Sequence, residues 1–312
     1  MALSVMLEQL VWPLAMVFAV LGGGVYLWAV LDGLAARSFG LPQAQSVWLT
    51  PLSRGTWLLI QQANSTEAPD LWAWRLAPAL YLALAAVGLA LVPWSQGWVA
   101  TDLATSLVLW GSLEALATVV IFLQGWSANS HFALVGAYRY VALGLSYILI
   151  SMFVLIGVAL PAESLALTRI VASQQDVWNL VRQPLGLPLF LMVGLALTFR
   201  GPFNLADPRD LAGGTSVEVS GPPRLVWELA RSAMLVAFSG IAATVFLGGW
   251  LGPWLPGPLW VMLKMLAILA LLAWLGRWFA VMTPSRCLSL MWLILLPLAF
   301  VDLVWAGVVA LL

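Results

Sequence analysis

The chain has 312 residues, of which 63% are hydrophobic and 8% charged, and its net charge at pH 7 is zero. A soluble domain carries about 25% charged residues, so a soluble protein of this size is excluded. The zero net charge gives no sign of nucleic-acid binding. The single cysteine excludes an intrachain disulfide, and with only one histidine the chain offers no ligand set for a metal or an iron–sulfur cluster.

Eight apolar runs follow one another along the chain. They cover residues 10–30, 76–93, 103–123, 137–160, 185–198, 225–250, 259–281 and 288–311. The runs are continuous instead of alternating, which favours helices over a β-barrel. The fifth run is short and flanked by proline, so its limits are the least defined. We predict an all-α, polytopic integral membrane protein with about eight transmembrane helices, forming a single transmembrane domain over residues 1–312.

Arginine marks one side of the predicted membrane domain. The loops after the first, fifth and seventh runs hold Arg37, Arg54, Arg75, Arg200, Arg209, Arg224, Arg277 and Arg286. The loops after the second and sixth runs hold no Lys or Arg, and the loop after the fourth holds Arg169 and Arg182. The positive-inside rule then places both termini in the periplasm of a bacterial inner membrane. The cytoplasmic loops at about 33–75 and 199–224 are long enough to bind a partner.

Ionisable side chains inside the apolar runs are candidates for function, because a charge within a membrane is expensive. Glu114 lies in the middle of the third run and has no basic neighbour in its own helix. Arg139, one hairpin away, is its expected partner. Glu228 and Arg231 lie one turn apart early in the sixth run, where they could also simply neutralise each other.

Three further charges lie within or at the end of apolar runs. Lys264, the only lysine, lies within the seventh run, and a snorkelling side chain is the structural alternative to a functional one. Asp32 closes the first run as an interfacial group, with Arg37 nearby. Asp302 lies within the eighth run and suits a cap or a hydrogen-bond partner.

The loop between the fifth and sixth runs holds a cluster of acids. Asp207, Asp210 and Glu218 fall within a dozen residues, and Gly213 and Gly214 permit a tight turn between them. A solvated loop is the structural alternative, but interleaved apolar residues give this segment an amphipathic character. Carboxylates that enter a membrane from its cytoplasmic face are what proton uptake would require.

Several strings occur together in an order and spacing that point to one family. They are WRLAPAL, QGWSANSHFALVGAYRYVALGLSYIL, RGPFNLADPRDLAGG, VEVSG, TVFLGGW and LWVMLK. From about residue 74 to its end, the chain resembles the H subunit of bacterial respiratory complex I, a membrane subunit that is equivalent to mitochondrial NADH dehydrogenase subunit 1. The resemblance implies a subunit that anchors the redox arm, forms much of the quinone tunnel and begins a proton path towards antiporter-like subunits.

The resemblance also implies roles for particular residues. The proton path would contain Glu114, Arg139, Asp207, Asp210, Glu218, Glu228 and Lys264, and the quinone site would contain Asp32, Arg37, Arg54 and Arg231. Quinone would be a cofactor shared with partner subunits. The partners would be the other membrane subunits and the peripheral iron–sulfur subunits of a complex-I-like assembly, within the lipid bilayer.

The chain departs from the family pattern at several positions, as a divergent member would. Asn204, Ile148 and Arg231 stand where the family has acids, Val219 replaces a tyrosine, and most of the first-loop signature is missing. Two alternatives therefore stay open. The chain could anchor a hydrogenase or formate-hydrogenlyase-type complex without quinone, or it could be a scaffold that has lost coupling. A stand-alone transporter is disfavoured because the sequence has no internal repeat.

Overall fold

The computed structural model describes residues 2–41, 46–208 and 213–311, with the side chains of 2–12 left aside. Its elements are α1 (Ala2–Ser38), α2 (Thr50–Ile60), α3 (Leu71–Ala90), α4 (Ser106–Ser127), α5 (His131–Ala159), α6 (Leu167–Ala172), α7 (Asn179–Arg182), α8 (Gly186–Leu197), α9 (Gly221–Phe246), α10 (Gly257–Trp278), α11 (Pro284–Leu290) and α12 (Leu296–Leu311). Within the described residues, 7 helices are long and apolar enough to cross a membrane. The predicted all-α polytopic membrane fold is confirmed.

Helix α8 is the predicted fifth span, and it is short. Its 12 residues rise about 18 Å, less than the roughly 30 Å of a bilayer core. The helix is followed by a 3₁₀ turn, Gly201–Phe203. Irregular backbone at membrane depth is tolerated where protein encloses it or where it lines a cavity. The end of α8 is therefore a natural place for a site.

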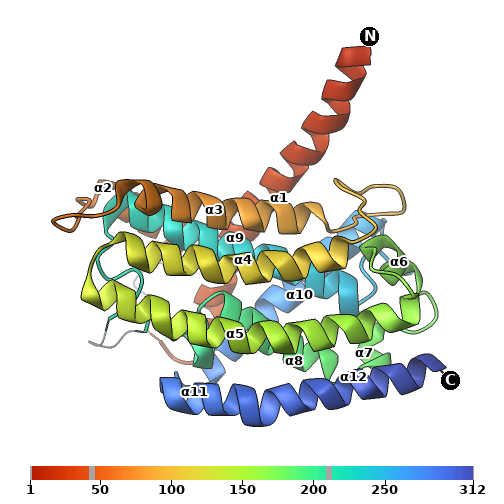
Figure 1. The fold of residues 1–312 in the computed structure, drawn as a ribbon. Helices are drawn as coiled ribbons and strands as arrows, with labels where there is room; N and C mark the ends of the chain where they lie inside the picture. The colour runs from red at the N-terminus through yellow and green to blue at the C-terminus, as the bar shows by residue number, and fades with distance from the viewer. Residues whose placement is uncertain (1, 42–45, 209–212, 312) are drawn as a thin grey trace.

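Helix α9 is the centre of the bundle and packs against α1, α3, α8 and α10 (Figure 1). Small residues dominate its buried stretch and let neighbouring helices approach closely: Ala230, Ala233, Ala237, Gly240, Ala242 and Ala243. Phe238 of α9 stacks on Phe190 of α8, with 4.5 Å between the ring centroids. This contact fixes α8 against the central helix.

Helices α1 and α10 close one side of the bundle around α9. Figure 1 shows the N-terminal half of α1 projecting away from the other helices, while its later turns pack on α9 and α10. Helix α1 contains Asp32 and continues to Ser38, so the predicted first loop begins about six residues later than expected. The remainder of the predicted first loop contains α2, which packs on α9.

Helices α11 and α12 form the last span with a π-helical turn, Met291–Leu295, between them. Helix α12 packs along α5 and also touches α8. Its outward face is apolar and exposed, at Phe300, Val301, Val304 and Trp305. This pattern fits a helix at the periphery of a membrane bundle.

Gly136 of α5 should be intolerant of any side chain. A Cβ there would lie 2.6 Å from the backbone N of Thr215 and 2.7 Å from the carbonyl oxygen of Ala206. Those two atoms form a hydrogen bond of 2.8 Å that folds the loop onto α5. We expect Gly136→Ala to destabilise the protein by about 1–3 kcal/mol, because the colliding atoms are backbone. Thermal unfolding in detergent measures this, and Gly111→Ala, in open space on α4, is the control.

Candidate functional site

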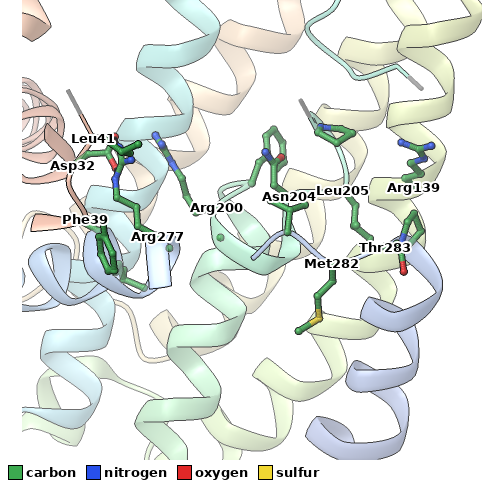
Figure 2. A pocket seen from close by; sticks show the side chains of 18 of the residues that line it. Asp32, Phe39, Leu41, Arg139, Arg200, Asn204, Leu205, Arg277, Met282 and Thr283 are labelled. Carbon is green, nitrogen blue, oxygen red and sulfur yellow. Dashed lines mark hydrogen bonds and ion pairs between the residues drawn. The ribbon is translucent and has the colours of Figure 1, made fainter. Parts of the chain in front are cut away.

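Two adjoining cavities of about 760 and 520 Å³ lie between α1, α10 and the end of α8. They share the lining residues Trp28, Asp32, Phe199, Arg200, Asn204, Pro208 and Arg277. Figure 2 shows how side chains from α1, α5, α10 and the segment after α8 converge on the larger cavity. Six arginines and three carboxylates line the two cavities, which makes their walls electropositive: Arg54, Arg139, Arg200, Arg224, Arg231, Arg277, Asp32, Asp207 and Glu228.

The end of α8 places Arg200 at the junction of the cavities. Phe199 has φ of 58° and Gly201 has φ of 57°, left-handed conformations that are strained for phenylalanine. A Cβ at Gly201 would lie 2.9 Å from the Cα of Gly276, so glycine permits the close approach to α10. The turn brings the guanidinium of Arg200 to 4.9 Å from the ring centroid of Trp28 in α1.

The positive charge of Arg200 is not balanced by a bound carboxylate in the part of the chain that the structure describes. No hydrogen bond or ion pair holds its guanidinium among the described residues, whereas Arg231 and Arg277 each bind a carboxylate. Burial lowers the pKa of its guanidinium to about 10, although the nearby Asp32 opposes that shift. A cation desolvated in this way next to a cavity is typical of a functional group.

An ion pair joins α1 to α10 at the rim of both cavities. Arg277 donates to Asp32 through Nε at 3.1 Å and Nη2 at 2.8 Å. The two residues lie 245 positions apart in the sequence. A bidentate guanidinium–carboxylate pair fixes orientation as well as distance, so this contact sets the width between the two helices.

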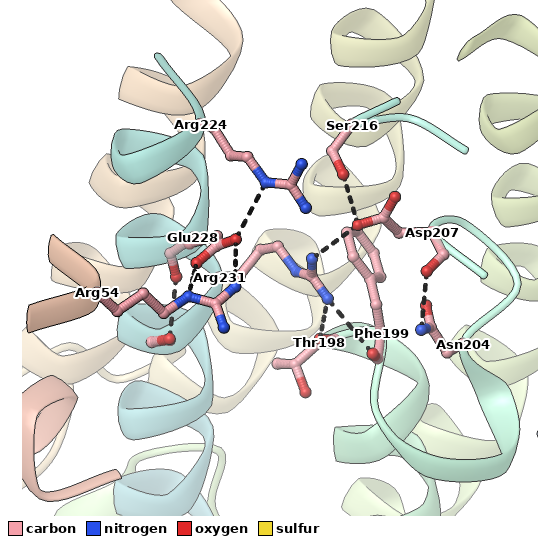
Figure 3. Close-up of polar contacts among 10 residues, drawn as sticks. Arg54, Thr198, Phe199, Asn204, Asp207, Ser216, Arg224, Glu228 and Arg231 are labelled. Carbon is pink, nitrogen blue, oxygen red and sulfur yellow. Dashed lines mark hydrogen bonds and ion pairs between the residues drawn. The ribbon is translucent and has the colours of Figure 1, made fainter. Parts of the chain in front are cut away.

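A second ion pair joins α9 to the loop after α8 (Figure 3). Arg231 donates to Asp207 at 3.2 Å and approaches the carbonyl oxygens of Thr198 and Phe199 at 3.5 and 3.4 Å. Its guanidinium also lies 4.4 Å from the ring centroid of Phe199. Asp207 accepts a further hydrogen bond of 2.6 Å from Ser216. Arg231 thus compensates the carbonyls at the end of α8 and holds the acidic loop.

Glu228 connects α9 to α2 instead of pairing with Arg231. Its carboxylate accepts from Arg54 at 2.8 and 3.1 Å and from Arg224 at 3.3 Å. The alternative in which Glu228 and Arg231 simply neutralise each other is therefore wrong, since each has a partner in another segment.

Glu114 lies deeper in the bundle than the cavities and is only 1% exposed. Its Oε1 accepts a hydrogen bond of 2.7 Å from Trp110. The expected pair with Arg139 is not formed. Tyr147, which donates to the backbone oxygen of Glu114, lies eight residues beyond Arg139, about 12 Å along α5. Arg139 instead lines the larger cavity.

A cluster of buried tyrosines connects the backbone at Glu114 to the end of α8, where the cavities lie. The hydroxyls of Tyr140 and Tyr147 lie 3.1 Å apart, and Thr118 lies 3.2 Å from Tyr147. Tyr140 and Tyr81 both donate to the carbonyl oxygen of Leu197, at 3.1 and 2.9 Å. The hydroxyls of Tyr81 and Tyr140 thus satisfy a carbonyl oxygen in the last turn of α8.

Lys264 lies far from the cavities, beside the C-terminal end of α9. Its ammonium donates to the carbonyl oxygens of Gly249 and Leu251, at 2.8 and 2.7 Å. The rings of Trp178 and Trp260 flank it at 4.7 and 5.5 Å. Lys264 therefore lies apart from the residues that line the cavities and binds the turn that follows α9.

The remaining predicted site residues fall in three places. Glu218 accepts a hydrogen bond of 2.6 Å from Ser130, which immediately precedes α5. Arg37 lies in the last turn of α1 and is not among the lining residues of the cavities. Asp210 lies outside the described residues. The structure thus brings together Asp32, Arg54, Arg139, Asp207, Glu228 and Arg231, but leaves Glu114 and Lys264 apart from them.

Sequence reasoning missed Arg200 and Arg277 as site residues. Arg277 was recognised only as a topology signal at the end of the seventh run. A search for cations directly after a short, interrupted span would have selected Arg200, because such a break must line protein or a cavity.

The sequence of the chain is similar to those of known proteins. A sequence model described as NADH dehydrogenase matches residues 42–307. The H 1 subunit of the NADH-quinone oxidoreductase of Rhodopseudomonas palustris (strain BisB5) is 32% identical over 81% of this chain and 79% of its own. The H subunit of Geobacillus kaustophilus is 33% identical over 81% and 77%, and the H 2 subunit of Cereibacter sphaeroides is 32% identical over 96% of both chains. The chain belongs to the NADH dehydrogenase family and is a multi-pass membrane protein of the type of the complex I H subunit.

Proposed function

We propose that the chain is the membrane-anchor, quinone-binding and proton-coupling subunit of a complex-I-like oxidoreductase in a bacterial inner membrane. The two adjoining cavities at the end of α8 carry this proposal, since they join an aromatic and aliphatic lining to a few fixed charges. The larger cavity, about 760 Å³, falls within the range of small-molecule sites. The names of the relatives, which are subunits of NADH-quinone oxidoreductases, support the same substrate.

The lining suits a quinone ring. Apolar walls come from Trp28, Phe39, Leu272 and Met282, and Arg200 supplies a donor for a carbonyl oxygen or a reduced oxygen. A quinone would supply two-electron chemistry coupled to proton uptake, with electrons from redox centres on partner subunits. The chain itself would orient the ring, exclude water and fix charge near the reduced oxygens.

The charged groups around the cavity would start the proton path. Asp207 and Glu228 line the smaller, adjoining cavity, and each is held by arginine. A change of charge in the cavity would alter the proton affinity of these carboxylates through Coulomb interaction. In this proposal the cavity opens towards the cytoplasm, and both termini lie in the periplasm, as the arginine distribution predicts.

Arg200→Gln tests the quinone site. Because folding lowers the pKa of Arg200 to about 10, its charge opposes folding by the full amount below that pH, and this penalty disappears progressively between pH 10 and the higher, ordinary pKa of arginine. We therefore expect Arg200→Gln to keep or raise stability at neutral pH while quinone reduction falls by an order of magnitude or more. Steady-state turnover against quinone concentration and thermal unfolding measure the two effects.

The exposed Arg286 of α11 provides the matched control, since Arg286→Gln removes a charge outside both cavities. Normal quinone turnover in Arg200→Gln would contradict the assignment of the cavity. Mass spectrometry of the tagged complex identifies the partners. A nickel–iron large subunit in that complex would support the hydrogenase-type alternative instead.

A further inference from the structure

Buried oxygen atoms without hydrogen-bond partners extend from Glu114 to the last helix. They are Glu114 Oε2, Ser151 Oγ, Gln183 Oε1 and Asp302 Oδ1, each unpaired among the described residues. All four side chains are at most 1% exposed. Native proteins leave few such atoms unpaired, so a group of them in one half of a bundle calls for an explanation.

A buried hydrogen bond joins Gln183, in the turn before α8, to Asp302 of α12. The amide of Gln183 donates to Asp302 Oδ2 at 2.6 Å and to the carbonyl oxygen of Val154 at 3.2 Å. A Cβ at Gly157 or Gly186 would lie 2.7 or 2.8 Å from the Gln183 side chain. The Gln183 side chain thus fits against two glycines because they have no side chains. Both hydrogens of its amide donate hydrogen bonds.

Ser151 lies between this contact and Glu114. Its hydroxyl faces the carboxyl group of Glu114. It also lies one turn before Val154, whose carbonyl holds Gln183, so about 5 Å separates the two positions along α5. Unpaired buried oxygens at this spacing are of the kind that hold bridging water.

Asp302 is better explained as a neutral acid than as a carboxylate. It forms no ion pair with any described residue, and a buried carboxylate with so few donors is strongly unfavourable in a membrane. A proton on Oδ1 would make that atom a donor. An asparagine would form the same contact with Gln183 without titrating, so the property that the aspartate adds is an exchangeable proton.

We propose that Asp302 is a proton-holding residue that exchanges its proton with Glu114 by way of Ser151, carrying the path laterally across the bundle to α12. When Glu114 is a carboxylate, the O–H bond of Asp302 breaks and its proton passes to Ser151, while Ser151 gives its own proton to Glu114 and an O–H bond forms there. Asp302 is left as the carboxylate, no electrons move, and the reverse transfer restores the neutral acid. Gln183 is a positioning residue that fixes Asp302. The inference rests on the proton-coupling role proposed above.

Proton translocation by the intact complex in proteoliposomes tests this route. Asp302→Asn keeps the contact with Gln183, so we expect normal assembly and normal quinone reduction but a loss of most proton translocation per electron. Ser151→Ala should slow translocation, whereas Ser146→Ala should not, because that buried hydroxyl of α5 only bonds the carbonyl of Ala142 in its own helix. Asp302→Glu should restore part of the loss.

Infrared difference spectroscopy gives a second readout that a purely structural role would not affect. The carbonyl-stretch band of a protonated carboxylic acid should disappear in Asp302→Asn and move to higher frequency in Gln183→Leu, which removes its hydrogen-bond donor. Full translocation by Asp302→Asn alongside failure of Glu114→Gln would overturn the route through α12 and leave the proposed function standing. Full translocation by both variants would instead reject the coupling role itself.

Discussion

Replacing Arg231 by leucine is expected to destabilise the protein by about 3 kcal/mol and to abolish quinone reduction. The guanidinium holds the Asp207 carboxylate and the last carbonyls of α8 and covers the ring of Phe199, and leucine replaces none of these contacts. An uncompensated carboxylate would remain at a site where Arg231 and Asp207 are only 12% and 17% exposed. The segment that positions Arg200 would lose its anchor.

The lone cysteine offers a direct measurement of this effect. Cys287 is fully buried, so a thiol-reactive fluorophore reports its exposure during thermal unfolding. Arg54→Leu is the matched control, because Arg54 is 61% exposed and Glu228 keeps Arg224. We expect the control to cost less than about 1 kcal/mol. Equal unfolding midpoints for the two variants would contradict the anchoring role of Arg231.

The ion pairs show why the sequence predicted the site residues better than their partners. Glu228 and Arg231 lie in an apolar run, where charges are few and expensive, and this alone selected them. Asp207 was selected as part of an acidic loop cluster, and Asp32 and Arg54 through the family resemblance. Where a partner was expected, it was a charge nearby in the sequence. Most of the observed pairs instead span many residues, up to the 245 between Asp32 and Arg277, and depend on helix packing that no local pattern contains.

The long transmembrane helices could be predicted from hydropathy alone. The short helix α8 was harder to delimit, because its apolar run is too short to span a bilayer. Continuous apolar runs fixed seven long helices and their order. The sequence showed the interruption after α8 as a short run flanked by proline, but it did not show that this interruption lines a cavity. Only the packed structure shows that Phe199 adopts a left-handed conformation and directs Arg200 into a cavity.

Glu114 illustrates a related limit. Its burial could be predicted from its place in the third run, but its environment could not, because helix register decides which residues of α5 face it. The register places Tyr147 and Ser151 there and leaves Arg139 at the cavity. A hairpin predicted from sequence gives the neighbouring helix but not the neighbouring turn.

Lys264→Met is the second substitution with a large expected effect, a loss of about 2–6 kcal/mol in the free energy of unfolding. Lys264 is 5% exposed, and its ammonium satisfies two carbonyl oxygens in the turn after α9, each of which costs about 1–3 kcal/mol when left unpaired. The long apolar side chain of methionine keeps the packing between Trp178 and Trp260 but supplies no donor.

The same substitution separates a structural Lys264 from one in the proton path. Leu263→Met, on the exposed face of α10, controls for methionine in this helix. If Lys264 stabilises the turn, Lys264→Met lowers the unfolding midpoint reported by Cys287, while the complex that still assembles translocates protons at the normal ratio to electrons. An unchanged midpoint combined with lost translocation would instead place Lys264 in the path. Because its hydrogen bonds go to backbone carbonyls, which cannot relay a proton onward to an acid, we expect the first result.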